Sequence, residues 1–215
     1  MATRPVYVPV NQAPFLSSRM IEFSWNAGFA ASQKKKNIVA LHEAYGKRFP
    51  DSKVLEISSK SLQELGVKLS AFNLKKYVPQ LEAYIPVECV FQGGKVFTNG
   101  GPYTDLYEKT SREAKKDERL KTSGTLEKFF FDGKEIPSTP KTAFYDWIYI
   151  NALLENPELA EGLLEYEAFT DIEFNPGKSI NCQAKAAAVY VSLAKQGMLE
   201  QCKEFETYYR LLKDG

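Results

Sequence analysis

Three polar side chains suited to acid–base and nucleophilic chemistry follow one another within residues 87–97: Glu88, Gln92 and Lys95. In a helix with about 3.6 residues per turn, these positions fall within about 60° of one another, beside an apolar face. A carboxyl group, an amide and an amine in one row can transfer a proton, orient a hydroxyl group and attack an electrophilic carbon. The same spacing also fits an ordinary polar edge of a surface helix, so spacing alone leaves both interpretations open.

Two glycines, Gly93 and Gly94, interrupt this row. Each would cost a helix interior up to about 1 kcal/mol relative to alanine. Positions without a side chain beside a polar row indicate that a ligand or another backbone approaches closely there. Pro86 lies just ahead, where a proline is tolerated at the start of a helix. We therefore expect a helix over residues 87–97 that carries the candidate site.

Composition limits the classes of protein to which the chain can belong. With 215 residues, 44% hydrophobic and 26% charged, it is long enough for one soluble globular domain with a sizeable core. The net charge of +1 provides no global attraction to nucleic acid, so contact with DNA would have to use a local site. The chain lacks an N-terminal signal core and any apolar run of about 18 residues. These features predict a cytoplasmic protein with no membrane partner.

Cysteine and histidine usage argues against a metal centre. Cys89, Cys182 and Cys202 are scattered without a CxxC pair, and His42 is the single histidine. The pattern contains no recognisable zinc site and favours a reducing compartment without structural disulfides. His42 lies in a helical pattern and is interpreted as structural, so neither a metal nor a cofactor is expected.

The remaining elements alternate between helices and short strands. Strands are predicted over residues 6–10, 21–25, 54–57, 67–74 and 168–174, with a hairpin over 126–136 that turns at Asp132-Gly133. Helices are predicted over residues 33–48, 143–154, 157–165, 179–195 and 199–212, the first after a Ser32 cap. A further short helix is predicted to end at Gly66. Lys75, Lys76 and Pro79 are expected in an exposed turn. The mixed-charge segment 108–121 is interpreted as a solvated face without a chemical role.

Two further features could contribute to a site. The turn over residues 98–103 contains Gly100 and Gly101, whose backbone N–H groups could cradle a phosphate. In the helix over 143–154, Asp146 and Trp147 fit either a surface beside the core or the wall of a pocket.

Several of these segments together resemble the NADAR superfamily. The segment Leu69-Ser70-Ala71-Phe72-Asn73 resembles its Leu-Ser-Asn-Phe loop, and Glu88, Gln92 and Lys95 match its Glu-x-x-x-Gln-x-x-Lys element. Trp147, Asp171 and the Asn181–Leu193 helix are similar to its downstream tryptophan, acid and C-terminal helix. The resemblance covers roughly residues 55–197.

Other segments are similar to the branch encoded beside DarT-type DNA ADP-ribosyltransferase toxins. These segments are Phe23–Phe29, Ser32–Lys34, Gly100–Tyr103, Phe144–Trp147 and Phe169–Pro176. One departure concerns Cys89, because many relatives carry histidine at that position. No histidine is therefore given a role.

The resemblance implies an α+β fold, a helix-rich single domain with a small β component over residues 1–215. Its parts would be a branch-specific segment (1–54), a core (55–197) and a C-terminal helix (198–215). The implied function is that of an antitoxin that removes ADP-ribose from guanine in DNA and is paired with a DarT-type toxin. ADP-ribosylated DNA would be the substrate and ADP-ribose the product. Alternatives are a small-molecule N-glycosidase of riboflavin-pathway type and a non-catalytic binder of ADP-ribose or of the toxin.

The residues can support cleavage of an N-glycosidic bond through an oxocarbenium-like centre. Lys95, if desolvated, would attack the opened sugar as a free amine and hold it as a Schiff base. Glu88 is the expected general acid or base, and Asp171 the second carboxylate that steadies positive charge or activates water. A direct attack by water, with Lys95 only binding, stays open. The expected ligand-binding residues are Ser70, Phe72, Asn73, Gln92, Gly100, Gly101, Tyr103, Trp147 and Asn181.

Overall fold

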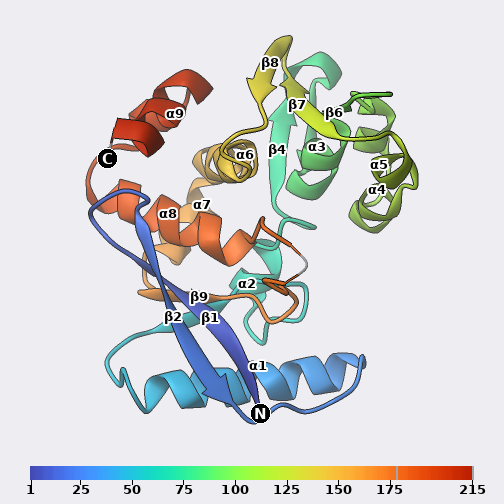
Figure 1. Cartoon of the computed structure of the whole chain (residues 1–215). Coiled ribbons are helices and arrows are strands. Elements are labelled where there is room, and N and C mark those ends of the chain that lie inside the picture. Colours follow the sequence, from blue (N-terminus) through green and yellow to red (C-terminus); the bar gives the residue numbers. More distant parts are fainter. Residues whose placement is uncertain (178, 215) are drawn as a thin grey trace.

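An antiparallel hairpin begins the chain and forms one side of the molecule (Figure 1). In the computed structural model, which describes residues 1–177 and 179–214, strand β1 (Ala2–Pro9) pairs with β2 (Leu16–Phe23) along its whole length. Strands β9 (Ala168–Thr170) and β3 (Val54–Glu56) extend this sheet in the order β2-β1-β9-β3, with β3 parallel to β9. The sheet thereby joins the N-terminal hairpin to residues 168–170 in the last quarter of the sequence.

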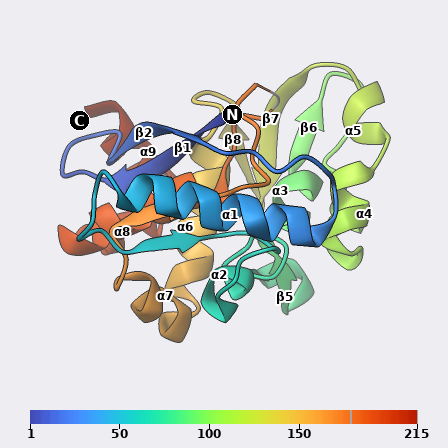
Figure 2. The same ribbon diagram turned by 90° about the horizontal axis from the view of Figure 1, so that it is seen from below.

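Helix α1 (Ala31–Gly46) runs across the lower face of the hairpin (Figures 1 and 2). Its buried residues Ile38 and Leu41 pack with Ile21 and Phe23 of β2 in a small separate core. Because Ile38 and Leu41 are three positions apart, they share one face of the helix. This core fastens β9, and the residues just beyond it, to the rest of the molecule.

Helices α6 (Ala143–Leu154) and α8 (Gln183–Lys195) form the centre of the main core. All residues of α6 from Ala143 to Leu153 are buried. Helix α8 contributes Ala184, Ala186, Ala187 and Ala188, which are fully buried and allow the two helix backbones to approach closely. The centre of the fold is thus a pair of helices from the second half of the chain.

Short elements surround these two helices. Two small antiparallel sheets consist of β4-β5 and β6-β7-β8. The strand bounds are Lys75–Val78 (β4), Ala83–Pro86 (β5), Lys95–Phe97 (β6), Leu126–Phe131 (β7) and Lys134–Pro137 (β8). The helix bounds are Glu64–Lys68 (α2), Val87–Gly93 (α3), Ser111–Lys116 (α4), Arg119–Thr122 (α5), Pro157–Leu163 (α7) and Phe205–Asp214 (α9), with 3-10 turns at Pro79–Leu81, Thr104–Glu108 and Leu199–Cys202.

The expected α+β class is confirmed. The predicted hairpin at Asp132-Gly133 is present, and the helix over residues 143–154 has the expected bounds. In the part of the chain that the structure describes, no helix has both the length and the apolar character needed to cross a bilayer.

Several local predictions were wrong. The segment 67–74 is not a strand, because α2 continues through Gly66 to Lys68 and turns follow it. The exposed turn expected at Lys75 and Lys76 is strand β4, in which Lys76 is buried and paired with Glu155. Helix α1 starts at Ala31 and not after a Ser32 cap, α8 starts at Gln183, and a break after Cys202 precedes α9.

The most consequential error concerns the helix expected over residues 87–97. Helix α3 ends at Gly93, and Lys95 begins strand β6, where it faces Phe129 of β7. The Gly94 carbonyl accepts a hydrogen bond from the Phe130 N–H at 2.7 Å. A Cβ on Gly93 would lie 2.4 Å from the Tyr107 ring. Close packing with the rest of the chain, as foreseen in one of the two interpretations, accounts for the glycines.

We expect Gly93→Ala to lower the free energy of unfolding by about 1–3 kcal/mol, because the added methyl group would force the Tyr107 ring to move. Gly46→Ala is a matched control, since nothing lies within 4 Å of its Cβ position at the end of α1. It should be neutral, or stabilising by up to about 1 kcal/mol. Urea unfolding of both variants would measure the difference, and equal stability of the two would contradict this account of Gly93.

Candidate active site

Glu88, Gln92 and Lys95 form a continuous hydrogen-bonded row. The Gln92 amide donates from Nε2 to Glu88 Oε1 at 2.8 Å, and Lys95 Nζ donates to Gln92 Oε1 at 2.7 Å. Gln92 therefore turns its N–H side to the carboxylate and its carbonyl side to the amine. The three groups meet although Lys95 lies outside the helix, because the turn at Gly94 brings its side chain back over α3.

Burial changes the acid–base properties of Lys95. Glu88 and Gln92 are only 5% and 7% exposed, and Lys95 Nζ lies 4.6 Å from the centre of the Phe91 ring. Removal from water lowers the pKa of Lys95 to about 8. The Glu88 charge opposes this shift, and the Lys115 charge adds to it. A substantial fraction of the amine is uncharged, and so nucleophilic, at slightly alkaline pH.

Asp171 follows strand β9 and presents a second carboxyl group. Its Oδ1 accepts backbone N–H groups of Glu173 at 3.0 Å and Phe174 at 3.2 Å. Part of the residue reaches the surface, but the carboxyl group is enclosed. Burial, and next the negative charge of Glu56, raise the pKa of Asp171 to about 8. The group therefore holds a proton at neutral pH.

A buried network behind Asp171 fixes its place. Glu56 accepts the Ile172 N–H at 2.8 Å and the Thr170 hydroxyl at 2.6 Å, so it holds both sequence neighbours of Asp171. His42 Nε2 lies 2.8 Å from the same Thr170 oxygen. Because that hydroxyl donates to Glu56, His42 donates to it as a neutral ring, and burial lowers the pKa of His42 to about 4. His42 has a structural place, as its helical pattern indicated.

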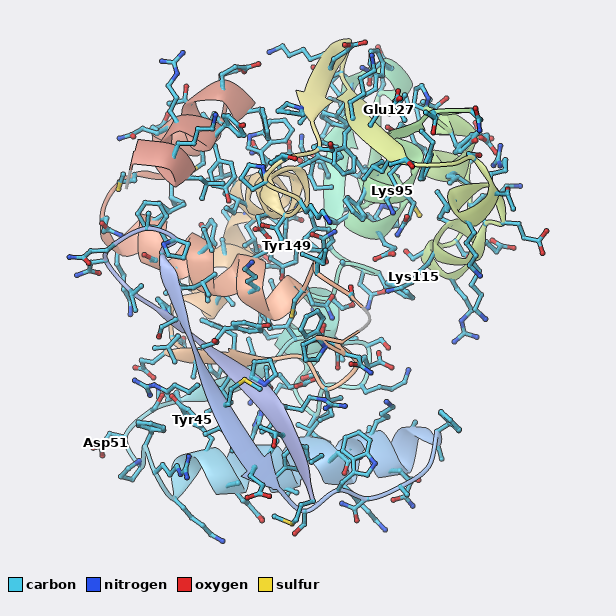
Figure 3. The ribbon with its side chains drawn as sticks, viewed as in Figure 1. Tyr45, Asp51, Lys95, Lys115, Glu127 and Tyr149 are labelled. Carbon is cyan, nitrogen blue, oxygen red and sulfur yellow. The ribbon has the colours of Figure 1, made fainter. Side chains whose placement is uncertain are left out.

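Two phenols of α6 connect the sides of the site. Burial raises the pKa of Tyr145 well above its ordinary value, and the charges of Glu88 and Asp171 raise it further. The neighbouring Tyr149 donates its hydroxyl to the Leu69 carbonyl at 2.7 Å. In Figure 3, Tyr149 lies just below α6, and Lys95 and Lys115 both lie to its right. The charges of Glu88 and Asp171 thus both act on the buried Tyr145.

The loop Leu69–Asn73 attaches α3 to its neighbours. The Ala71 carbonyl of this loop accepts a hydrogen bond of 2.9 Å from the Glu88 N–H. The Ser70 hydroxyl and the Asn73 amide both donate to the Val67 carbonyl at 2.8 Å, so their donors are engaged in the turn itself. Phe72 is only half-buried. Of the three side chains predicted here, Phe72 is the one best placed to stack on a flat ligand.

The glycine turn lies against the backbone of β6. Gly100 donates its N–H to the Phe97 carbonyl at 3.3 Å, and a Cβ on Gly101 would lie 2.2 Å from the Lys95 carbonyl oxygen. The Tyr103 hydroxyl contacts Ser123 through a hydrogen bond. These contacts support the strand that carries Lys95, and the expected phosphate-binding role of the turn stays a prediction.

Trp147 points away from the row. Its indole N–H donates to the Cys202 carbonyl at 2.9 Å, and its ring packs edge-on against Phe131 and Phe205. Together they line a cavity of about 130 Å³ near the C-terminal helix. Since residues two apart on a helix point in nearly opposite directions, Trp147 cannot share the side of α6 that carries Tyr145. The structure does not bring Trp147 to the other predicted residues.

Two further polar residues lie near the carboxyl groups of the site: Lys115 beside Glu88, and Asn181 directly before Cys182, whose thiol is 3.9 Å from Asp171 Oδ2. The buried Oδ1 of Asn181 has no hydrogen-bond partner among the described residues, so it can accept a donor from a ligand. Lys115 of α4 lies in the segment interpreted as solvated, yet its Nζ is 3.7 Å from Glu88 Oε1. Ser111 and Ala114 are buried on the inward face of α4. In the sequence, the only sign of this packing was that two small residues lie three positions apart in an otherwise charged segment.

Comparison with known proteins adds one result. The model of the family described as DarT1-associated NADAR antitoxin matches residues 2–215. No curated protein matches the chain. The family match includes both the N-terminal hairpin and the core that holds the row. Within the described residues, no group of three or more His, Cys, Asp or Glu side chains could hold a metal ion.

We expect Asp171→Asn to stabilise the protein at pH 7 by about 1–3 kcal/mol. The unfolded chain ionises this carboxyl at its ordinary pKa of 3.8, whereas the folded protein keeps the proton up to about 8. Folding therefore takes up a proton, and its cost grows as pH rises between these values. Asparagine is neutral and keeps the acceptor oxygen. Thermal unfolding at pH 5 and pH 7 should show a gain that increases with pH, whereas Glu127→Gln, at an exposed acid of β7, should change little. A less stable Asp171→Asn protein at pH 7 would contradict the assignment.

Proposed function

The chain belongs to the family of DarT1-associated NADAR antitoxins, and on this basis we propose that it removes ADP-ribose from guanine bases in DNA. Its functional counterpart would be a DarT-type toxin, and free ADP-ribose would be the product. The observation that carries the proposal is the desolvated Lys95 amine, hydrogen-bonded through Gln92 to Glu88. An amine of lowered pKa beside carboxyl groups is suited to attack on a sugar C1″ carbon.

In the proposed reaction, the ribose opens before the amine attacks. Asp171, which holds a proton at neutral pH, donates it to the ring oxygen. The bond from C1″ to this oxygen breaks, and the guanine nitrogen supplies the electron pair that forms an iminium ion. The Lys95 amine adds to C1″, and the guanine amine leaves with a proton relayed from the Lys95 nitrogen. A Schiff base between Lys95 and the sugar results.

Hydrolysis then completes the cycle. Glu88 accepts a proton from a water molecule, which adds to C1″ of the Schiff base. Glu88 passes this proton to the Lys95 nitrogen as the bond from C1″ to that nitrogen breaks, which regenerates the free amine. The new C1″ hydroxyl gives its proton to Asp171, which restores the acid, and the sugar leaves as an aldehyde that can close its ring. Gln92 holds the amine and the carboxylate in fixed relation through both steps. Asn181, whose Oδ1 has no partner among the residues that the structure describes, would accept a ribose hydroxyl, and Phe72 would stack on a base.

A direct mechanism uses the same residues without a covalent intermediate. In it, Glu88 activates water for attack on C1″, and Lys95 only binds the substrate. The lowered pKa of Lys95 favours the covalent route, because a residue that serves only as a cation gains nothing from losing its proton.

We expect Lys95→Ala to abolish release of ADP-ribose from guanine-modified DNA, and Glu88→Gln to lower it by about 10²–10⁴-fold, the contribution typical of a positioned acid or base. Lys128→Ala is a matched control, since this lysine faces Val96 on the paired strand and lies on the surface. Borohydride added during turnover should trap a covalent adduct on Lys95. Release without any adduct over repeated trials would favour the direct mechanism, and release by Lys95→Ala would refute both.

The same assay separates the other candidate functions. ADP-ribosylated guanosine, modified DNA and riboflavin-pathway intermediates would be offered in parallel. Cleavage of the riboflavin-pathway compounds alone would indicate a small-molecule N-glycosidase. Tight binding of ADP-ribose without any release would indicate a non-catalytic reader.

We expect a bell-shaped dependence of kcat/KM on pH, with its maximum near pH 8. Activity should rise with pH as Lys95 loses its proton, and fall at higher pH as Asp171 loses the proton that it must donate, since both pKa values are about 8. Rates of release measured from pH 5 to pH 10 would test this. Asp171→Asn should lose most of its activity, and the activity that remains should no longer fall at high pH. A wild-type rate that stays constant above pH 9 would contradict the role of Asp171.

A further inference from the structure

Lys115 lies at the outer edge of the candidate site. Its Nζ is 3.7 Å from Glu88 Oε1 and 5.1 Å from the centre of the Phe72 ring. More than half of its side chain, 57%, is exposed, compared with 6% for Glu88. The ammonium group is thus positioned between the buried carboxylate and solvent, beside the half-buried aromatic side chain of the loop 69–73.

The helix that carries Lys115 is firmly held. A capping box joins Thr110 and Glu113 at the start of α4. The Ser111 hydroxyl donates to the Phe72 carbonyl at 3.0 Å, and the Cys89 thiol of α3 lies 3.8 Å from the same hydroxyl. The backbone under Lys115 is therefore fixed relative to both α3 and the Phe72 loop, while its amine can move.

The contact with Glu88 is weak enough to be exchanged. A charge-assisted hydrogen bond from nitrogen to a carboxylate is about 2.7–2.9 Å long, and the contact here is longer. Ion pairs with an exposed partner contribute little and are screened by salt. Glu88 also keeps the Gln92 amide as a donor if Lys115 leaves. Lys115 can therefore take another anion without leaving the carboxylate unpaired.

The charges inside the site leave a need for such a cation. Asp171 is neutral at pH 7, and the buried Lys95 amine already donates to Gln92, so neither group offers an accessible cation next to the Glu88 carboxylate. A phosphate group that enters beside Glu88 would be repelled unless a fixed cation accompanies it. We propose that Lys115 binds a phosphate of the substrate and exchanges Glu88 for a phosphate oxygen. This inference rests on the proposed function, because it takes the substrate to be a nucleotide.

The phosphate could come from two parts of the proposed substrate. One is the diphosphate within ADP-ribose, and the other is the DNA backbone next to the modified guanine. Both offer the same chemistry to an ammonium group, and both could place a base on Phe72. Ligands that contain one source without the other will distinguish them.

The first test is equilibrium binding of ADP-ribose to the full chain by calorimetry. If Lys115 contacts the diphosphate, Lys115→Ala should bind ADP-ribose about tenfold more weakly than wild type, equivalent to about 1.4 kcal/mol, and Lys115→Arg should keep most of the affinity; if it contacts the DNA backbone, the same loss should appear only with DNA ligands. Lys116→Ala is the matched control. Lys116 is exposed, adjacent on α4 and absent from the ion pairs of the described residues, so its loss should change affinity by less than twofold. Thermal unfolding of each variant should match wild type, because both side chains lie at the surface.

The second test compares ADP-ribosylated guanosine, modified DNA and the same DNA without the modification. A similar loss for the first two, with none for unmodified DNA, assigns Lys115 to the diphosphate. A loss confined to the two DNA ligands assigns it to the DNA backbone. Affinities of Lys115→Ala within twofold of wild type for all ligands would overturn the proposal. So would an equal loss in Lys116→Ala, or a wild-type protein that binds none of them.

The outcomes separate this inference from the proposed function. Weaker binding by Lys115→Ala, together with no release of ADP-ribose by wild type, would retain the phosphate contact and refute the hydrolase. Normal release by wild type, with unchanged KM and affinity in Lys115→Ala, would retain the hydrolase and refute the phosphate contact.

Discussion

Ionisable groups that are removed from water must be paired or become neutral, and the site is built on this constraint. Lys95 and Asp171 approach neutrality from opposite sides, the amine by losing a proton and the carboxyl group by keeping one. Glu88 is buried but paired, by the Gln92 amide and by Lys115. The bulky α6, with Tyr145 and its other buried residues, supplies the enclosure on which these shifts depend.

Two structural devices hold the reactive groups in place. On one side, α3 ends at Gly93, and the following turn redirects the chain so that Lys95 reaches back to Gln92. On the other, Glu56 binds the residues on both sides of Asp171, and its negative charge adds to burial, the larger effect, in raising the pKa of the Asp171 carboxyl group. The first device is a matter of backbone packing and the second of buried hydrogen bonds. Both connect the chemistry to distant parts of the chain.

The N-terminal hairpin and α1 are part of this support. They contribute no residue to the Glu88–Gln92–Lys95 row, but His42 of α1 reaches Thr170 and so joins the network behind Asp171. Strand β1 also pairs with β9 at Tyr7 and Phe169. The family match from residue 2 onwards agrees with a fold in which the first residues and the candidate site form one unit.

The sequence by itself determined the family, the α+β class, helix α6 and the hairpin at Asp132-Gly133, because local signals such as Asp-Gly turns and long apolar runs act over a few residues. It also identified Glu88, Gln92 and Lys95 as a group, although it placed all three on one helix. Tertiary structure decided where Lys95 lies, because the Gly94 carbonyl is bound by the Phe130 N–H and Lys95 pairs with Phe129 of β7. It likewise turned Trp147 to the C-terminal segment and brought Lys115 to Glu88. These outcomes depend on which surfaces pack together across long sequence separations, and no local pattern encodes that packing.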